Sequence, residues 1–349
     1  MKKYEHGGRI YDKEVRLDFS ANINPYGMPN GVKEAIVNGI NQYHLYPDDD
    51  VTALREAIAK AEGVSTESVI CGNGASDLIY RLCDSLRPKK ACVLAPTFSE
   101  YEKALCSAGC EVSYLELKEE KQFRFHMELL SDLPGETDVF FLCNPNNPVG
   151  AVLTSEELEQ VIIECTKKDI FLVLDECFLD FMEDHDAYSG KKFLQIEEYT
   201  SRVFLLKAFT KLYGMAGIRL GYGICQNKKL LDSMHFHGPA WNVSTPAQFA
   251  GLAALKEQEY VKTTRKTIET ERKYLESELQ KLGYKVYPSS VNYILFQAPQ
   301  GLASHCLKHG ILIRTCENYV GLSRHHFRIA VKLREDNETL IQCMRKFQK

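Results

Sequence analysis

The chain has 349 residues, which is long enough for one large domain and a smaller one, although length alone does not decide this. Its content of 44% hydrophobic and 26% charged residues is ordinary for a soluble globular enzyme. Its formal net charge of -4 and its pI near 6.2 argue against nucleic acid or an anionic membrane surface as the main partner. No apolar run approaches the ~20 residues that a membrane-spanning helix needs, and no apolar block follows the basic amino terminus as it would in a secretory signal.

The predicted elements of the first two thirds of the chain alternate between strand and helix. Continuous apolar runs, typical of strands buried on both faces, lie at 91–95, 138–143, 170–175 and 202–206. Helical patterns lie at 75–86 and at 155–168, the second of which opens on a serine followed by two glutamates. This alternation predicts an α/β domain built on a mainly parallel sheet.

After residue 245 the pattern changes. Residues 257–283 predict one long amphipathic helix, with Val261, Ile268, Leu275, Leu279 and Leu282 near one face. Strands are expected at 291–296 and 326–332, in a mixed α+β segment. We therefore expect a large domain at 40–245 and a small domain formed by 1–39 and 246–349.

The twelve cysteines are scattered and include no C-x-x-C pair. Zinc sites usually use such closely spaced pairs, so the sequence predicts no metal site. The expectation is mostly buried, reduced thiols in a cytoplasmic protein.

Polar residues follow three of the predicted strands. The segment "NPNNPVG" (144–150) follows one strand, Asp175 ends the next, and Lys211 lies a few residues beyond the last. Ligands of open α/β sheets bind at the carboxyl ends of the strands, so an amide, a carboxylate and an amine are expected to meet there. Each feature alone also has an ordinary interpretation, as turn chemistry or as a helix cap.

The segment "CGNGASDLIY" (71–80) predicts a phosphate site, because glycines before a helix expose backbone N–H groups at the positive end of its dipole. Asp77 stands where a dinucleotide fingerprint has its third glycine, which disfavours a nicotinamide-dependent dehydrogenase. Arg219 is a candidate countercharge for the same phosphate. The alternatives are a plain turn and a surface arginine.

A lysine, a carboxylate and a phosphate cradle together match the needs of pyridoxal 5′-phosphate. That cofactor is held as a lysine Schiff base, with an acidic partner on its pyridine nitrogen and anchors for its phosphate.

These motifs resemble the fold-type I pyridoxal-phosphate enzymes of the class I/II aminotransferase group, over essentially the whole chain. "FTKLYGMAGIRLGY" (209–222) is similar to the family's Schiff-base lysine segment, "LVLDECF" (172–178) to its aspartate segment, and "NPNNPVG" to its asparagine loop. The resemblance implies a large domain with a mainly parallel, seven-stranded sheet flanked by helices. It also implies a smaller α+β domain formed by both chain ends.

The resemblance further implies roles for single residues around the cofactor ring. Lys211 would carry the cofactor and move protons, Asp175 would pair with the ring nitrogen, and Asn147 would contact the ring hydroxyl. Phe98, in "PTFSEY", would stack on the ring. Phe178 stands where many members have a tyrosine, which leaves Asn147 as the neutral donor to the ring hydroxyl.

The cofactor phosphate would be held by Arg219, Thr210 and the N–H groups of Ala75 and Ser76. Ala208 replaces a frequent hydroxyl residue, so one phosphate contact is missing. Tyr46, in "LYP", would reach the phosphate in a neighbouring subunit, which implies a homodimer. Arg328, in "FRIAVK", would bind the α-carboxylate of the substrate.

Two branches of the family fit best, and both act on small phosphorylated substrates. Segments 6–8, 17–29 and 311–322 look closer to threonine-phosphate decarboxylases of cobalamin biosynthesis than to histidinol-phosphate aminotransferases. A non-catalytic binding protein on the same scaffold is a third hypothesis, which the retained Lys211 disfavours.

A phosphorylated substrate needs a second anionic pocket, for which His6, Asn22 and Arg314 are the candidates. Their ordinary alternatives are a terminal histidine, a turn asparagine and a surface arginine. Trp241 is a candidate wall of the substrate pocket or a packed aromatic. Asn292 is a weaker site candidate, and its neighbour Tyr293 is expected in the core.

Overall fold

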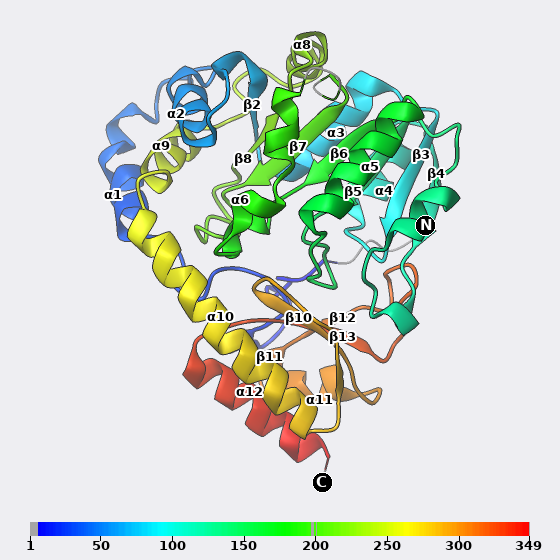
Figure 1. Ribbon diagram of the computed structural model, residues 1–349. Helices are drawn as coiled ribbons and strands as arrows, with labels where there is room; N and C mark the ends of the chain where they lie inside the picture. Colours follow the sequence, from blue (N-terminus) through cyan, green and yellow to red (C-terminus); the bar gives the residue numbers. More distant parts are fainter. Residues whose placement is uncertain (1–5, 197–198, 200, 349) are drawn as a thin grey trace.

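The computed structural model describes residues 6–196, 199 and 201–348. A seven-stranded sheet in the order β2-β8-β7-β6-β5-β3-β4 forms the centre of the larger part (Figure 1). β8 runs antiparallel to both of its neighbours, and all other pairs are parallel. The predicted mainly parallel sheet is thereby confirmed. Its strands are β2 (Val69–Gly72), β3 (Lys90–Ala95), β4 (Glu111–Glu116), β5 (Val139–Cys143), β6 (Phe171–Asp175), β7 (Val203–Ala208) and β8 (Gly221–Ile224).

Helices cover both faces of this sheet because the side chains of its inner strands alternate between two apolar cores. Val173 lies in one core and Leu174 in the other. The first core packs against α3 (Ala75–Leu86), α4 (Glu100–Ser107) and α8 (Lys228–Phe236), and the second against α5 (Ser155–Lys167). Helix α5 begins with a capping box in which Thr154 and Glu157 bond each other's backbone N–H groups.

The smaller part contains an antiparallel sheet in the order β12-β13-β10-β9, seen below the large sheet in Figure 1. Strand β1 pairs in parallel with β11, so the two ends of the chain meet in this part. The long helix α10 occurs as predicted, with Ile268, Leu275 and Leu279 buried. The elements are β1 (Leu17–Asp18), β9 (Lys285–Val286), β10 (Tyr293–Gln297), β11 (Ile311–Leu312), β12 (Arg314–Thr315), β13 (His326–Ala330), α10 (Gln258–Lys281), α11 (Leu302–Lys308) and α12 (Arg334–Phe347).

Three further helices, α1 (Asn30–Asn38), α2 (Thr52–Glu62) and α9 (Thr245–Ala254), pack together beside the large sheet (Figure 1). Val32, Leu54 and Ala250 on these helices share one apolar core with the large sheet. The predicted division of the chain at residues 40 and 245 stays a prediction. The remaining short helices are α6 (His185–Tyr188), η1 (Ile40–Gln42), η2 (Thr66–Ser68), η3 (Glu119–Lys121), η4 (Met127–Asp132), η5 (Leu179–Phe181) and η6 (Gly190–Gln195).

Within the described ranges, none of the helices combines the length and the apolar character needed to cross a bilayer. All twelve cysteines carry free thiols, and all but Cys106 and Cys177 are buried, as the sequence predicted.

Candidate active site

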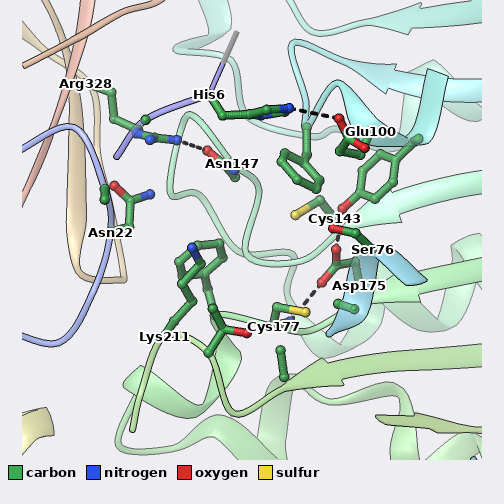
Figure 2. A pocket seen from close by; sticks show the side chains of 18 of the residues that line it. His6, Asn22, Ser76, Glu100, Cys143, Asn147, Asp175, Cys177, Lys211 and Arg328 are labelled. Carbon is green, nitrogen blue, oxygen red and sulfur yellow. Dashed lines mark hydrogen bonds and ion pairs between the residues drawn. The ribbon is translucent and has the colours of Figure 1, made fainter. Parts of the chain in front are cut away.

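A cavity of about 420 Å³ lies at the carboxyl ends of β5 and β6, between the large sheet and the sheet that carries β13 (Figure 2). Eleven of the residues predicted for the site line it, whereas Tyr46, Arg314, Trp241 and Asn292 do not. The predicted residues in its wall are His6, Asn22, Ala75, Ser76, Phe98, Asn147, Asp175, Thr210, Lys211, Arg219 and Arg328.

Asp175 is the last residue of β6, and both of its carboxylate oxygens are held. The Cys177 N–H donates to Oδ1 at 2.9 Å, and the Tyr101 hydroxyl donates to Oδ2 at 2.5 Å. Burial raises the pKa of the Asp175 carboxyl, against the opposing effect of these two donors. No cationic side chain of the described residues lies within ion-pair distance of this carboxylate, which is therefore suited to receive a cationic group from a ligand.

Sequence reasoning missed Tyr101, although it lies three residues after Phe98 on α4. Its ring is fully buried, edge-on to Phe98 at 5.6 Å and stacked on Phe141 at 5.2 Å. The only available signal was its place in "PTFSEY", one helical turn beyond the predicted stacking residue.

Lys211 projects its half-buried side chain into the cavity (Figure 2). Burial, and then the nearby positive charge of Arg328, lowers the pKa of its amine to about 8. The ring of Phe178 lies 6.0 Å from Nζ and forms an apolar part of the wall. An amine with this pKa has a substantial neutral fraction near neutral pH, so it can act as a nucleophile or a base.

The amino terminus of α3 and the Arg219 side chain lie together in the cavity wall and form a candidate anion-binding cradle. Gly74 precedes the helix with a φ of +85°, and a Cβ on it would lie 2.5 Å from Nη2 of Arg219. A Cβ on Gly221 would lie 2.5 Å from the backbone nitrogen of Ala75. The two glycines therefore let the guanidinium and the amino terminus of α3 approach each other closely, and backbone N–H groups beside a guanidinium can bind a phosphate.

Arg328 is buried on β13 at the opposite side of the cavity. It donates to Asn147 Oδ1 through Nη1 and to the Ser20 carbonyl through Nη2 at 2.9 Å. Its Nε and the Asn22 Oδ1 are buried without a hydrogen-bond partner among the described residues. Polar groups that are buried without a partner cost free energy, so they are typical of positions where a polar ligand supplies the missing hydrogen bond.

His6 lies at the cavity, so the "HGG" segment folds over the site (Figure 2). Its Nε2 is 2.8 Å from Oε1 of Glu100, and its ring is 5.8 Å from that of Phe98. Gly8 donates its N–H to Ser20 Oγ at 2.8 Å, which ties the segment to the strand-like stretch beside Asn22. Glu100, like Tyr101, was not predicted for the site.

Two of the predicted residues, Arg314 and Tyr46, do not line the cavity of their own chain. Arg314 pairs with Arg328 in the register of β12 and β13, but it donates to Asn318 Oδ1 at 2.8 Å and does not line the wall. Its place there is taken by Tyr319, whose ring lies 5.7 Å from the Arg314 guanidinium. The assignment of Arg314 to the substrate phosphate stays a prediction.

Tyr46 is 77% exposed and stacks on Trp241, with 4.3 Å between ring centroids. Trp241 does not line the cavity of its own chain, in contrast to one of its two predicted interpretations. Tyr293 is fully buried, as expected for a core residue. Asn292 lies outside the wall and donates to the Asn22 carbonyl at 3.0 Å, so it supports the segment that carries Asn22.

The family model described as aminotransferase class I and II matches residues 14–343. The chain belongs to this family. Pyridoxal 5′-phosphate is the family's cofactor, and the cavity fits it, since an anion cradle, a buried carboxylate and an amine of lowered pKa line one wall. The chain is thus a pyridoxal-phosphate-dependent enzyme of the fold-type I class, as the sequence predicted.

Individual relatives of this aminotransferase-family chain carry two different names. A provisionally named threonine-phosphate decarboxylase from Caldanaerobacter subterraneus subsp. tengcongensis is 37% identical, over 99% of this chain and 94% of its own. The threonine-phosphate decarboxylase of Salmonella typhimurium is 31% identical, over 97% and 95%. The crystal structure of the histidinol-phosphate aminotransferase from Clostridium acetobutylicum superimposes with a TM-score of 0.88 at 30% identity, over 95% of this chain and 99% of that one.

Proposed function

We propose that the enzyme decarboxylates L-threonine O-3-phosphate to (R)-1-amino-2-propanol O-2-phosphate and carbon dioxide, a step of cobalamin biosynthesis. The observation that carries the proposal is a cavity with anion-binding groups at two separate places beside one amine. Arg219 and the α3 amino terminus lie at one place, and Arg328, His6 and Asn22 at the other. The first suits the cofactor phosphate, and the second suits a substrate that carries a carboxylate and a phosphate.

In this proposal the residues around the ring keep the cofactor in place and charged. Lys211 would hold the cofactor covalently, Asp175 would balance the charge of its ring nitrogen, and Phe98 would pack against the ring. Asn147 donates to the ring hydroxyl; Phe178 offers no polar group there. When bound, the cofactor supplies an electron sink for the charge that develops on the substrate Cα.

Lys211 also moves the proton that the reaction needs. Loss of carbon dioxide leaves two electrons at Cα, and one proton must be added there to complete the amine product. Nζ of Lys211 projects into the cavity and, with a pKa of about 8, holds or releases a proton near neutral pH. The apolar ring of Phe178 beside it limits the access of water to this proton.

Arg328 and the residues near it select the substrate. Arg328 holds the α-carboxylate, and its present bonds to Asn147 and Ser20 fix the plane of the guanidinium. His6 and Asn22 face the substrate phosphate, with His6 oriented by Glu100. Arg314, which pairs with Arg328 in the register of β12 and β13, is the third candidate for the substrate phosphate.

An aminotransferase acting on histidinol phosphate is the second candidate, favoured by the 30% identity to the Clostridium acetobutylicum enzyme. Both reactions use Lys211 and Asp175, and they differ in which bond to Cα lies perpendicular to the cofactor ring. The decisive experiment gives the loaded enzyme L-threonine O-3-phosphate alone and, separately, histidinol phosphate with 2-oxoglutarate.

Release of carbon dioxide and an amino alcohol phosphate, in the absence of any keto acid, is the expected result. Unphosphorylated threonine serves as the matched control and should react far more slowly, because it leaves the groups around His6 and Asn22 without their anion. Formation of glutamate from histidinol phosphate and 2-oxoglutarate, without decarboxylation of threonine phosphate, contradicts the proposal.

We also propose that the enzyme is a cytoplasmic homodimer in which Tyr46 reaches the cofactor phosphate of the partner subunit. The high exposure of Tyr46 and its stacking on Trp241 support this, since two large aromatic rings exposed together are typical of a contact surface. A mixing experiment that tests the shared site is described in the Discussion.

A further inference from the structure

A second group of metal-ligating side chains lies away from the cofactor cavity, where α11 meets α12. His305 is on α11, His309 follows its last residue, and Cys343 is on α12. One ligand atom of each lies within 4.8 Å of the other two. Figure 1 shows both helices at the end of the molecule that is far from the large sheet. The sequence predicted no metal site because it contains no closely spaced cysteine pair. These three ligands instead come from two helices that are separate in the sequence.

The two histidines are spaced as a chelating pair. Residues four apart at a helix end lie on one face, and their ring centroids are 4.6 Å apart. With zinc–nitrogen bonds of about 2.0–2.1 Å, two imidazoles on one tetrahedral Zn²⁺ have centroids about 5 Å apart. The observed separation therefore needs little adjustment.

Hydrogen bonds to backbone carbonyls fix which ring nitrogen of each histidine carries its proton. His309 Nδ1 lies 3.0 Å from the His305 carbonyl, and His305 Nε2 lies 3.1 Å from the Cys343 carbonyl. A carbonyl oxygen only accepts, so the bonded nitrogen is the donor and the other nitrogen keeps its lone pair. Histidines that ligate metals are usually held in this way.

Cys343 adds a sulfur ligand from the opposite helix. It is buried, whereas His305 is half-buried and His309 exposed, so the group opens to solvent on one side only. One thiolate with two imidazoles is a donor set for Zn²⁺ rather than for Mg²⁺ or Ca²⁺, which prefer oxygen ligands.

We propose that His305, His309 and Cys343 bind one Zn²⁺ ion, with the fourth position open to water. The ion joins α11 to the C-terminal helix α12, behind the sheet that carries Arg328. Its role is to stabilise the packing of these helices, and it takes no part in the reaction at the cofactor.

The test uses the holoenzyme after removal of metals by a chelator and dialysis. Calorimetric titration with ZnCl₂ should show one tight site per chain, and Zn²⁺ should raise the melting temperature. His309→Ala should weaken this binding by at least about tenfold and remove the thermal shift. Because His309 is exposed, its loss does not threaten folding. Cys343→Ser should weaken Zn²⁺ binding to the same extent. Co²⁺ should give the visible absorption bands of a four-coordinate, thiolate-bound ion in the parent enzyme, and these bands should be absent in Cys343→Ser.

The matched controls are His235→Ala and Cys106→Ser, which remove an exposed histidine and an exposed thiol elsewhere on the chain. Both should bind Zn²⁺ as the parent does. Equal zinc affinity in the parent and in His309→Ala overturns the proposal, as does an equal loss in His235→Ala. If Cys343→Ser does not fold, His309→Ala and His305→Ala decide the question. Threonine phosphate turnover should be the same with and without Zn²⁺, so failure here is separate from failure of the proposed reaction.

Discussion

Tyr101→Phe tests how the buried carboxylate of Asp175 is kept ready for the cofactor. The substitution removes one hydroxyl and keeps the ring that packs between Phe98 and Phe141. Asp175 then loses one of its two hydrogen-bond donors and keeps only the Cys177 N–H. No cavity forms, so the change is electrostatic.

The expected size follows from the kind of bond that is lost. A hydrogen bond to a charged group contributes about 1.5–3 kcal/mol, and its loss raises the pKa of the Asp175 carboxyl further. The proton shared between Asp175 and the cofactor ring nitrogen then shifts toward the carboxylate, and the ring accepts electrons less well. If the whole effect is felt in the transition state, kcat/KM falls about 10- to 150-fold.

The assay combines kcat/KM with the pH dependence of the visible absorbance of the bound cofactor. Tyr287→Phe is the matched control, because it removes a buried hydroxyl that donates to Glu119 at 3.0 Å outside the cavity. It should leave both readings unchanged. If Tyr101→Phe keeps the parent kcat/KM and the parent absorbance profile, the hydroxyl does not tune Asp175 and the reasoning is wrong.

Three other predictions concern the cofactor cavity. The rate at which cofactor-free protein binds pyridoxal phosphate should rise with pH through about 8, because only the neutral Lys211 amine attacks. In Arg328→Gln the pH at the midpoint of this rise should be higher, since a neighbouring positive charge that lowers the pKa of Lys211 is lost. Gly74→Ala should weaken pyridoxal phosphate binding by about tenfold or more, because the new methyl group displaces Arg219. The affinity for unphosphorylated pyridoxal should not change, and equal losses for both compounds would show that Gly74 and Arg219 do not form the phosphate site. Mixing and reassembling inactive Tyr46→Ala with inactive Lys211→Ala should restore about one quarter of parent activity, since half of the dimers are mixed and each has one complete site; no recovery despite mixed dimers would argue against a shared site.

The core of the fold was predictable because buried parallel strands leave a clear trace in the sequence. The runs at 138–143 and 170–175 correspond to β5 and β6 within one residue, since every residue of these strands is buried. Strand β8 (Gly221–Ile224) left no such trace, because it is short and half of it is glycine. Its antiparallel place between β2 and β7 depends on contacts with distant residues.

The site was predictable where residues follow a strand or a family motif, and not where distant residues meet. Asp175 and Lys211 could be found from their positions after strands. Tyr101 could not, because its partner lies 74 residues away and a tyrosine in a helix carries no local sign of that contact. The position of Arg314 beside Arg328 could not be found either, because it depends on the register of β12 and β13.

Asp175 and Lys211, the two central ionisable groups of the cavity, have pKa values shifted in directions that one bound ligand can offset. Burial makes the Asp175 carboxyl harder to ionise, and burial together with Arg328 makes Lys211 harder to protonate. In the free protein both displacements oppose the charged forms. The displacement at Asp175 costs stability above the ordinary pKa of an aspartate, and that at Lys211 costs stability below the ordinary pKa of a lysine. A ligand that presents a cationic ring nitrogen to Asp175 and a carbonyl carbon to neutral Lys211 relieves both displacements, while its anion is held by Arg219. The same strain that destabilises the free cavity therefore adds to the affinity for pyridoxal phosphate, which is why the cofactor should stabilise the fold as well as supply its chemistry.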